Sequence, residues 1–514
     1  MSIKQLKSSF PLICVFITFL FFIRYHHGHA QSFADRFSAD ISVYSTFGSE
    51  KEQSFWLTRN RFDIFDQESG NGLTILSGKL ETNPERIFDL GGKLDVVARA
   101  SADEKIFLQE AYIEARAGYI SIIAGRKNNL LGHPYENLST GSMVMSRNVR
   151  PMPRISISVP EFEEIPLTRG WLEYKGHFAH GWFDDERYVD NPYIHDKSVY
   201  IRTGADTGFS FYVGVVHLAI WGGTSPVHDE LPDNFNDFLR VVTIRAGDED
   251  SPSNERNNKL GFHTGTYDSG FMIPIKETDL HFYYQHLFTD GSGQRFRNLG
   301  DGLFGLLLKN PFPQRWITSV LFEYSDTRKQ SGPGMSDKRE GDWPWFCEER
   351  NCGERYGARD NYFNNSIYRS GLSYQGNSMG SPFFLTTADL SRIDPEANPY
   401  STQLFASNRN LSYHLGVEGF FSKEVGYRFL SSYVRYFGTY AGLNLGTYWG
   451  SRNPELNQED YFFNPSRNQW YFMLETHWQP AQMENIRFTA TLAADHGHLY
   501  NNVGMLLGIN WKLK

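Results

Sequence analysis

Several segments of the sequence place aromatic side chains beside carboxylate, guanidinium or amide groups. Aromatic rings stack on the C–H faces of sugars, and planar polar groups hydrogen-bond to their hydroxyl edges. We therefore predict a polysaccharide-binding surface made of Trp182, Asp184, Asp185, Arg187, Trp221, Asp290, Arg295, Trp343 and Trp345. For a single aromatic residue, the favoured alternative is an anchor at a membrane interface. Trp343 and Trp345 fit that alternative least, because they lie deep in a long predicted loop.

Few residues match a catalytic pattern. Gly376-Asn377-Ser378-Met379-Gly380 has the spacing of a nucleophile elbow, but an elbow needs a strand-to-helix turn in an α/β sheet. We place this run in a short periplasmic turn and interpret the match as chance. The acidic run at 184–186 is equally well explained as a solvated loop. A hydrolase would also need a Ser and a His that meet across neighbouring strands, so we predict no enzyme and no cofactor.

The sequence contains three cysteines, of which Cys14 lies in the N-terminal apolar run. Cys347 and Cys352 remain after that segment is removed. In an oxidising compartment two cysteines so close in sequence most simply form a loop disulfide. Two thiolates alone do not complete a zinc site, so we predict no metal site.

The N-terminal residues have the pattern of a secretory signal peptide. Lys4 and Lys7 precede an apolar run over residues 10–23, and Gly28-His29-Ala30 supplies the small residues of a cleavage site. We predict a signal peptide over residues 1–30 and one domain over residues 31–514. A retained N-terminal anchor is the alternative. The net charge of −9 becomes more negative on cleavage, which argues against a nucleic-acid partner.

Composition after residue 30 favours a membrane barrel. No apolar run approaches the ~20 residues that a membrane helix needs, yet Phe, Tyr and Trp make up 16% of the chain. A soluble all-β protein could have the same composition. An outer-membrane barrel accounts for it, because lipid-facing apolar side chains alternate with polar lumen-facing ones and aromatic girdles flank the apolar band.

The C-terminal sequence has the alternation that such a barrel requires. Every second residue is apolar over 503–513, and the segments 486–494 and 470–478 repeat the pattern. A period of two over about ten residues fits tilted spanning strands. We predict an all-β fold, a transmembrane antiparallel up-and-down β-barrel of about 18 strands with long extracellular loops.

Connection lengths give an independent signal, because long and short connections alternate along the chain. The short ones are 275–279, 310–314, 422–425 and 479–485, and the long ones are 222–266, 290–302, 328–363 and 441–468. Outer-membrane barrels have short periplasmic turns and long extracellular loops. We therefore place both termini in the periplasm and the cysteine pair outside the cell. Apolar residues at helical spacing predict one short helix over 234–246.

A series of short runs then points to a family. The runs are Gly125-Arg126-Lys127, Arg147-Asn148-Val149-Arg150-Pro151-Met152-Pro153, Gly170-Trp171-Leu172-Glu173-Tyr174-Lys175-Gly176, His180-Gly181-Trp182-Phe183, Trp221-Gly222-Gly223-Thr224-Ser225-Pro226, Thr266-Tyr267-Asp268, Tyr284-Gln285-His286, Asp290-Gly291-Ser292-Gly293, Asn361-Tyr362-Phe363-Asn364-Asn365 and His414-Leu415-Gly416. Each run alone is unspecific, but in this order the sequence resembles the bacterial Wzi capsule-assembly proteins. The likeness is densest over about 118–335.

The resemblance implies an eighteen-stranded outer-membrane barrel that acts as a lectin. Such a protein would help attach capsular polysaccharide to the cell surface, without catalysis and without a cofactor. Its partners would be surface polysaccharide, outer-membrane lipid and, during biogenesis, the barrel-insertion machinery. The alternative function is a diffusion or export channel. A lumen blocked by loops would favour the lectin, and an open lumen with charged rings would favour the channel.

The sequence departs from the family pattern in two places. Family members can carry N-terminal helices that plug the barrel, but here the predicted cleavage site is soon followed by strand-like residues 41–44. The plug is therefore absent, or loops such as 234–246 replace it. The chain also ends in Lys514 where barrels commonly have an aromatic residue. We expect Trp511 or Leu513 to serve the insertion machinery instead.

Overall fold

The computed structural model describes residues 35–513 apart from 84–85, 103–104, 130, 133–136, 205–207, 290, 311–314, 331–359, 399–402 and 444–459. The predicted signal peptide therefore lies outside the described residues. Asp290, Trp343, Trp345, Cys347 and Cys352 lie outside them too.

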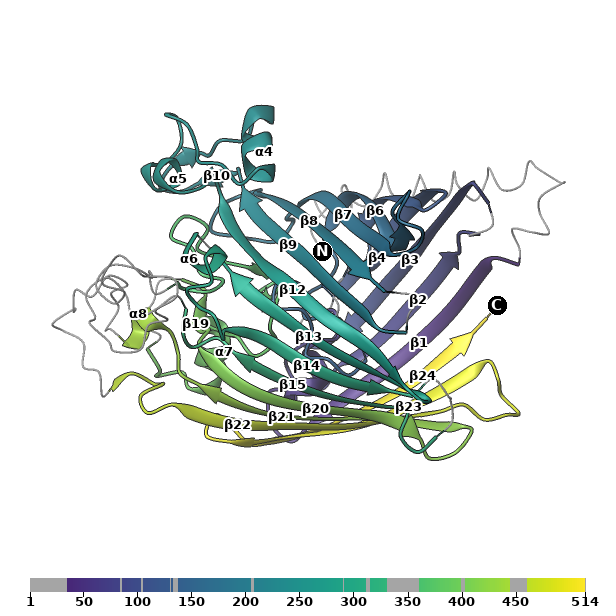
Figure 1. Cartoon of the computed structure of the whole chain (residues 1–514). Coiled ribbons are helices and arrows are strands. Elements are labelled where there is room, and N and C mark those ends of the chain that lie inside the picture. The colour runs from purple at the N-terminus through teal and green to yellow at the C-terminus, as the bar shows by residue number, and fades with distance from the viewer. Residues whose placement is uncertain are drawn as a thin grey trace.

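The chain forms one closed antiparallel β-barrel of 18 strands (Figure 1). Each strand pairs with the next along the chain, and β1 also pairs with β24, which closes the barrel. The strands are β1 (Phe37–Gly48), β2 (Gly72–Leu80), β3 (Phe88–Ala100), β4 (Lys105–Ala117), β5 (Ile120–Arg126), β6 (Pro153–Glu164), β7 (Leu172–Trp182), β8 (Tyr193–Thr203), β9 (Ser210–Trp221), β12 (Phe262–Ile275), β13 (Thr278–Phe288), β14 (Gly302–Lys309), β15 (Ser319–Asp326), β20 (Asn410–Phe420), β21 (Val425–Tyr436), β22 (Arg467–Trp478), β23 (Ile486–Gly497) and β24 (Asn502–Lys512). The predicted fold is confirmed.

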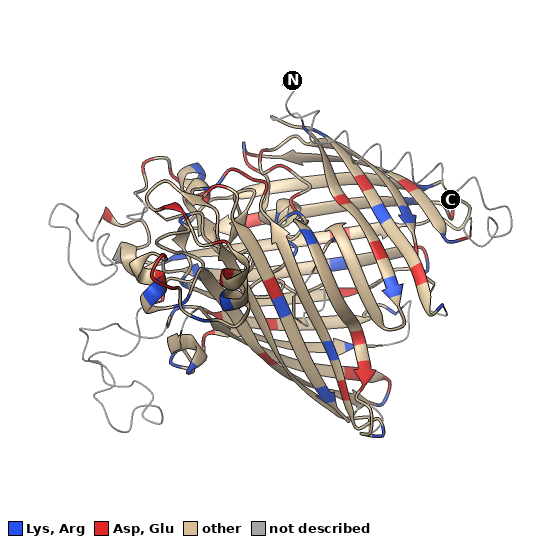
Figure 2. Cartoon of the chain, turned by 90° about the horizontal axis from the view of Figure 1, so that it is seen from above, with Lys and Arg blue, Asp and Glu red and all other residues tan. Residues whose placement is uncertain are grey.

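Side chains alternate between the two faces of the wall, as the period of two requires. On β24, Val503 and Leu507 point outward and are 57% and 46% exposed, while Leu506 points inward and is fully buried. Charged side chains such as Glu323 and Glu475 are buried on the inner face, and Figure 2 shows acidic and basic residues along the strands of the wall. Several inward tyrosines lie flat over a glycine of the next strand, as Tyr200 does over Gly214. A Cβ at Gly214 would collide with that ring.

No helix among the described residues is long and apolar enough to cross a membrane.

The connections at one rim are mostly long and those at the other are short, as the sequence predicted. We call the rim with long connections the outer rim. It carries 49–71, 127–152, 183–192, 222–261, 289–301, 327–409 and 437–466, with two short exceptions at 101–104 and 498–501. The first and last strands meet at the opposite, inner rim, where Asp40 pairs with Lys512. The connection that contains Cys347 and Cys352 therefore joins two strand ends at the outer rim.

Three of the long connections fold back into the barrel and fill much of its lumen, where Arg61 reaches Glu475 of β22 and Asn137 reaches Arg428 of β21. We call these three segments together the plug. It consists of residues 49–71 and of the described residues within 127–152 and 360–409. Their short elements are α3 (Phe55–Thr58), β16 (Ser373–Tyr374), β17 (Asn377–Ser378), β18 (Leu385–Thr386), α7 (Thr387–Ile393) and β19 (Phe405–Ser407). The Phe55 ring stacks on Tyr471 of the wall, with 4.0 Å between ring centroids. It also contacts the fully buried rings of Trp56 and Phe383.

The run 376–380 was predicted to lie in a short periplasmic turn, and that prediction is wrong. It belongs to the β16–β17 hairpin of the plug, within a connection of the outer rim. Its apolar residue Met379 is fully buried against other plug segments and not against lipid. The hairpin is followed by loop and not directly by a helix, so it is no nucleophile elbow.

The predicted helix over 234–246 is present as α4 (Phe235–Val242), capped by Asn234. It does not enter the lumen, so the prediction that loops replace the plug holds for other connections and is wrong for 234–246. Val241 packs on Ala219 and Trp221, whose side chains alternate with the inward-facing Ile220 and therefore face outward. Figure 1 places α4 above the ends of β8 and β9. The other short elements at this rim are β10 (Thr224–Ser225), β11 (Asp229–Glu230), α5 (Ser253–Asn257), α6 (Gly291–Gln294) and α8 (Tyr440–Leu443).

Candidate functional site

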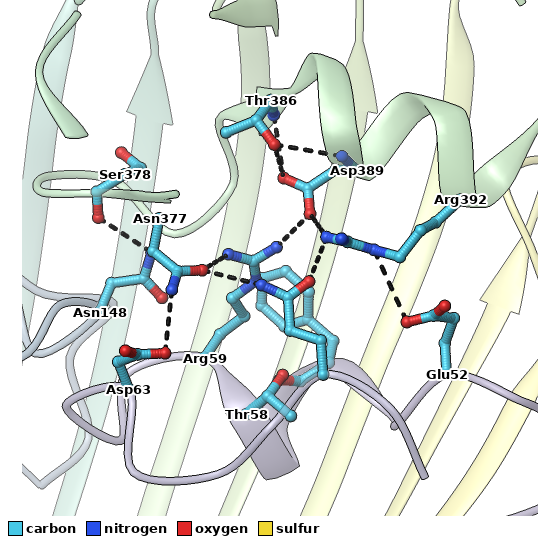
Figure 3. Close-up of polar contacts among 12 residues, drawn as sticks. Glu52, Thr58, Arg59, Asp63, Asn148, Asn377, Ser378, Thr386, Asp389 and Arg392 are labelled. Atoms are coloured by element: carbon cyan, nitrogen blue, oxygen red, sulfur yellow. Dashed lines mark hydrogen bonds and ion pairs between the residues drawn. The ribbon is translucent and has the colours of Figure 1, made fainter. Parts of the chain in front are cut away.

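A buried polar junction locks two plug segments together (Figure 3). Arg59, just after α3, donates to Asp389 of α7 at 2.6 Å and to the side-chain oxygen of Asn377 at 2.7 Å. Arg392 also reaches Asp389, at 2.5 Å, and Asn377 donates to Asp63 at 3.1 Å. Every charge here has a partner inside the protein, as a buried charge requires. The junction therefore acts as a structural clamp, and its residues Arg59, Asp389 and Arg392 also line a cavity of 270 Å³.

The structure brings Asp184, Asp185 and Arg187 together, but against the plug. Arg187 donates to the carbonyl oxygens of Ser373 and Gly371 at 2.7 and 2.9 Å, and Asp185 accepts from the Gln375 amide at 2.9 Å. Both side chains are buried, with 2% and 8% exposed. These contacts favour a structural role for Asp185 and Arg187, and their contact with polysaccharide stays a prediction. The backbone of the plug hairpin takes up their hydrogen-bonding capacity.

Asp184 and the two predicted tryptophans have different surroundings. Asp184 stays half exposed and pairs with Arg126 and the Tyr374 hydroxyl. Trp221 is 3% exposed and packs with Phe238 of α4, which favours a structural role, and its contact with polysaccharide stays a prediction. Trp182 is the last residue of β7, faces outward and is 40% exposed, which fits a girdle anchor.

Arg295 is exposed at the outer rim, directly after α6. Its exposure leaves it accessible to a large ligand, and its role in binding stays a prediction. The roles of Asp290, Trp343 and Trp345, and the Cys347–Cys352 disulfide, stay predictions because those residues lie outside the described part of the chain.

Sequence reasoning missed a cleft of 530 Å³ at the outer rim. Two long connections form it, 222–261 with the start of β12 on one side and 360–403 on the other. We call it the amide cleft, because its lining is rich in side-chain amides and hydroxyls. The lining includes His228, Ser253, Asn254, Glu255, Asn258, Lys259, Thr289, Asp360, Asn361, Asn364, Asn365, Ser366 and Gln403.

One side of the amide cleft is pre-organised by hydrogen bonds between its own amides. Asn361 donates to Gln403 at 2.7 Å and accepts from Asn364 at 3.0 Å. The other side is less constrained. Asn254 and Asn258 are exposed, and Asn254 donates across the cleft to the Ser366 hydroxyl at 3.3 Å. Amide groups both donate and accept, as sugar hydroxyls do. The cleft can therefore hold a hydroxyl-rich ligand by paired hydrogen bonds.

Glu255 holds this side of the cleft in place from beneath. Its Oε1 accepts from the Gly261 amide at 3.0 Å, while Oε2 is buried without a hydrogen-bond partner among the described residues. Burial raises the pKa of the Glu255 carboxyl to about 7. A protonated carboxyl suits this buried position better than a carboxylate, because burial penalises the charged form. No group of His, Cys, Asp and Glu in the described part of the chain is arranged to hold a metal ion.

The sequence model of the capsule assembly protein Wzi family matches residues 26–343. Among solved structures, Wzi of Escherichia coli superposes with a TM-score of 0.55 and 15% identity, covering 92% of this chain and 84% of its own. OprD of Pseudomonas aeruginosa gives a TM-score of 0.42 with 10% identity and coverage of 93% and 95%. OpdL of the same organism gives 0.45 with 8% identity and coverage of 93% and 99%. A comparison with curated protein sequences found no match.

Proposed function

Because the chain belongs to the Wzi family of capsule assembly proteins, we propose that it binds capsular polysaccharide outside the cell and helps hold the capsule to the outer membrane. The Escherichia coli Wzi is an outer membrane protein involved in group 1 capsule assembly and a carbohydrate-binding β-barrel. On this proposal the predicted signal peptide directs export, and the outer rim faces the capsule.

The observation that carries the proposal is the amide cleft, which lies at the rim that would face the capsule. Each hydrogen bond to a sugar hydroxyl contributes only about 1 kcal/mol. A polymer is nevertheless held firmly when many such sites on one cell engage it together, since each further contact becomes intramolecular. Exposed Asn254 and Asn258 are the first residues we assign to polysaccharide contact.

The plug argues against the second candidate, a diffusion channel. Residues of three connections fill much of the lumen and hydrogen-bond to the wall across it. A solute would have to displace a packed core and not merely pass a constriction. We also propose that the protein is not an enzyme, because holding a polymer requires no bond cleavage.

Surface plasmon resonance with purified full-length protein in detergent tests this function. Capsular polysaccharide from the producing strain should bind, and a neutral dextran of equal length should bind much more weakly. The recovered polysaccharide should keep its chain length on size-exclusion chromatography. Absence of binding would refute the lectin, and shortened chains would refute the non-enzymatic assignment.

A further inference from the structure

A second cavity lies inside the barrel, on the inner side of the plug. It has a volume of 270 Å³, and β4 to β8 form its wall, while plug residues such as Leu131 and Gly132 close it toward the outer rim. Its lining reaches from Arg154, the second residue of β6 counted from the outer rim, to Lys175, the fourth residue of β7 counted from the inner rim. We call it the inner chamber. It shares no residue with the amide cleft.

Most charges that line the inner chamber are neutralised by a partner. Lys127 pairs with Glu114 at 3.2 Å, and Arg154 pairs with Asp196 at 2.8 Å. His177 also reaches Asp196, at 2.8 Å. Each of these charges is balanced within the protein, as a charge removed from water requires.

Lys175 is different. Its side chain faces the chamber, and its ammonium nitrogen lies 4.9 Å from the ring centroid of Tyr200 and 5.3 Å from that of Phe162. Aromatic faces attract a cation but do not neutralise it. Within the described residues no carboxylate is at ion-pair distance from this nitrogen. The chamber therefore holds one positive charge without a counter-ion from the protein.

An unused acceptor lies in the same chamber. The backbone amide of Asn128 donates to Glu110 at 2.8 Å, but its side-chain oxygen is buried and has no hydrogen-bond partner among the described residues. A buried polar atom without a partner calls for an explanation, and a donor bound in the chamber would supply one. Hydroxyls of Ser156, Ser158 and Ser198 complete the lining. A ligand that matches these groups would carry a negative charge for Lys175, a hydrogen-bond donor for Asn128 and further polar groups for the serine hydroxyls.

We propose that the inner chamber binds an anionic sugar unit that carries a carboxylate beside its hydroxyls. The carboxylate pairs with the Lys175 ammonium, and a sugar hydroxyl donates to the Asn128 side-chain oxygen. This site goes beyond the proposed binding at the cell surface, because the plug separates it from the outer rim. It would meet its ligand from the periplasmic side.

Isothermal titration calorimetry on the purified full-length protein tests the proposal, with sodium glucuronate as the probe. Glucose and inorganic phosphate are the comparison ligands, because one lacks the charge and the other lacks the sugar. Glucuronate should bind about tenfold more tightly than either, since a charge-assisted contact adds to those of the hydroxyls. Equal binding of glucose removes the role of the charge, and equal binding of phosphate removes the sugar, so either result overturns the proposal.

Variants assign the binding to the chamber. Lys175→Met keeps the apolar stem and should weaken glucuronate binding about tenfold or more. Lys423→Met is the matched control, since Lys423 is exposed in the inner-rim turn between β20 and β21, and it should bind normally. Asn128→Ala is a second, independent variant and should weaken binding even if Lys175→Met does not fold. Normal affinity in a folded Lys175→Met or in Asn128→Ala overturns the assignment.

A further comparison tells whether the ligand is a sugar residue within a polymer or a free sugar acid. The methyl glycoside of glucuronate mimics an acidic residue within a polymer, because its anomeric position is blocked. Equal binding of the glycoside supports a polymer residue as the ligand, and binding of the free acid alone supports a free sugar acid. Surface binding of polysaccharide through Asn254 and Asn258 is measured separately, so the two proposals succeed or fail independently.

Discussion

Ser139 donates a hydrogen bond from its hydroxyl to Glu323 at 2.5 Å, although the two residues approach from opposite sides of the barrel. Ser139 belongs to the connection between β5 and β6, whereas Glu323 is on β15, eight strands from β5 in the order around the barrel. The adjacent Thr140 adds donations from its amide at 2.8 Å and its hydroxyl at 2.7 Å. One buried carboxylate thus holds a plug segment across the lumen.

Replacing Glu323 by Ala should loosen the plug and open the barrel. The change leaves several buried donors without an acceptor, at a cost on the order of 3 kcal/mol. We expect Glu323→Ala protein in planar bilayers to conduct ions more than the wild type. Glu277→Ala removes an exposed carboxylate from an inner-rim turn and is the control. Wild-type conductance in a folded Glu323→Ala would mean that this crossing does not keep the lumen closed.

The connection 222–261 should become less stable as the pH rises. Burial raises the pKa of Glu255 from 4.5 to about 7, so folding favours the protonated form. The stabilisation, at most about 3 kcal/mol, is complete below pH 4.5 and is lost as the pH passes 7. Limited proteolysis of this connection should be faster at pH 8.5 than at pH 5.5. Glu255→Gln should remove the difference, and a wild-type rate independent of pH would contradict this account.

Arg187 should contribute to stability and not to ligand contact. Its guanidinium is buried and supports the plug hairpin through two carbonyl oxygens. Arg187→Ala removes both bonds and the partner of Asp185, which costs on the order of 3 kcal/mol. Thermal unfolding should occur at a lower temperature, while the folded protein binds polysaccharide with near-wild-type affinity. Full loss of binding without loss of stability would restore Arg187 as a ligand contact.

The wall could be predicted from sequence because its signal is local. On β24 each lipid-facing residue, such as Leu507, stands next to an inward-facing one, and the period of two repeats over the whole strand. The alternation of connection lengths then predicted which strand ends lie at each rim. Neither signal depends on residues far apart in the chain.

The plug and the amide cleft could not be predicted in this way, because distant segments form them. Asn254 meets Ser366 across 112 residues of sequence, and Arg187 meets Ser373 across 186. Charge and aromatic content place a residue near a surface but do not tell whether another segment covers it. Trp221 shows the consequence, since α4 covers a ring that the sequence suggested was free.

The tryptophans of the long connection between β15 and β20 still merit a direct test. Trp343→Ala with Trp345→Ala should leave insertion intact, because we place both residues outside the membrane band. Loss of two stacking rings, each worth on the order of 1 kcal/mol, should weaken polysaccharide binding. Surface plasmon resonance on the purified double variant gives the answer. Wild-type affinity would make these two residues dispensable for binding.

The central claim is best tested by the fraction of capsular polysaccharide that a culture releases into its medium. A strain that lacks this protein should release most of it, and the wild-type chain should restore a cell-bound capsule. Asn254→Ala with Asn258→Ala should fail to restore it, whereas Asn257→Ala, on the same helix but outside the cleft lining, should succeed. A deletion strain that keeps its capsule would contradict the account, and a cell-bound capsule in the double variant would contradict the assignment of the amide cleft.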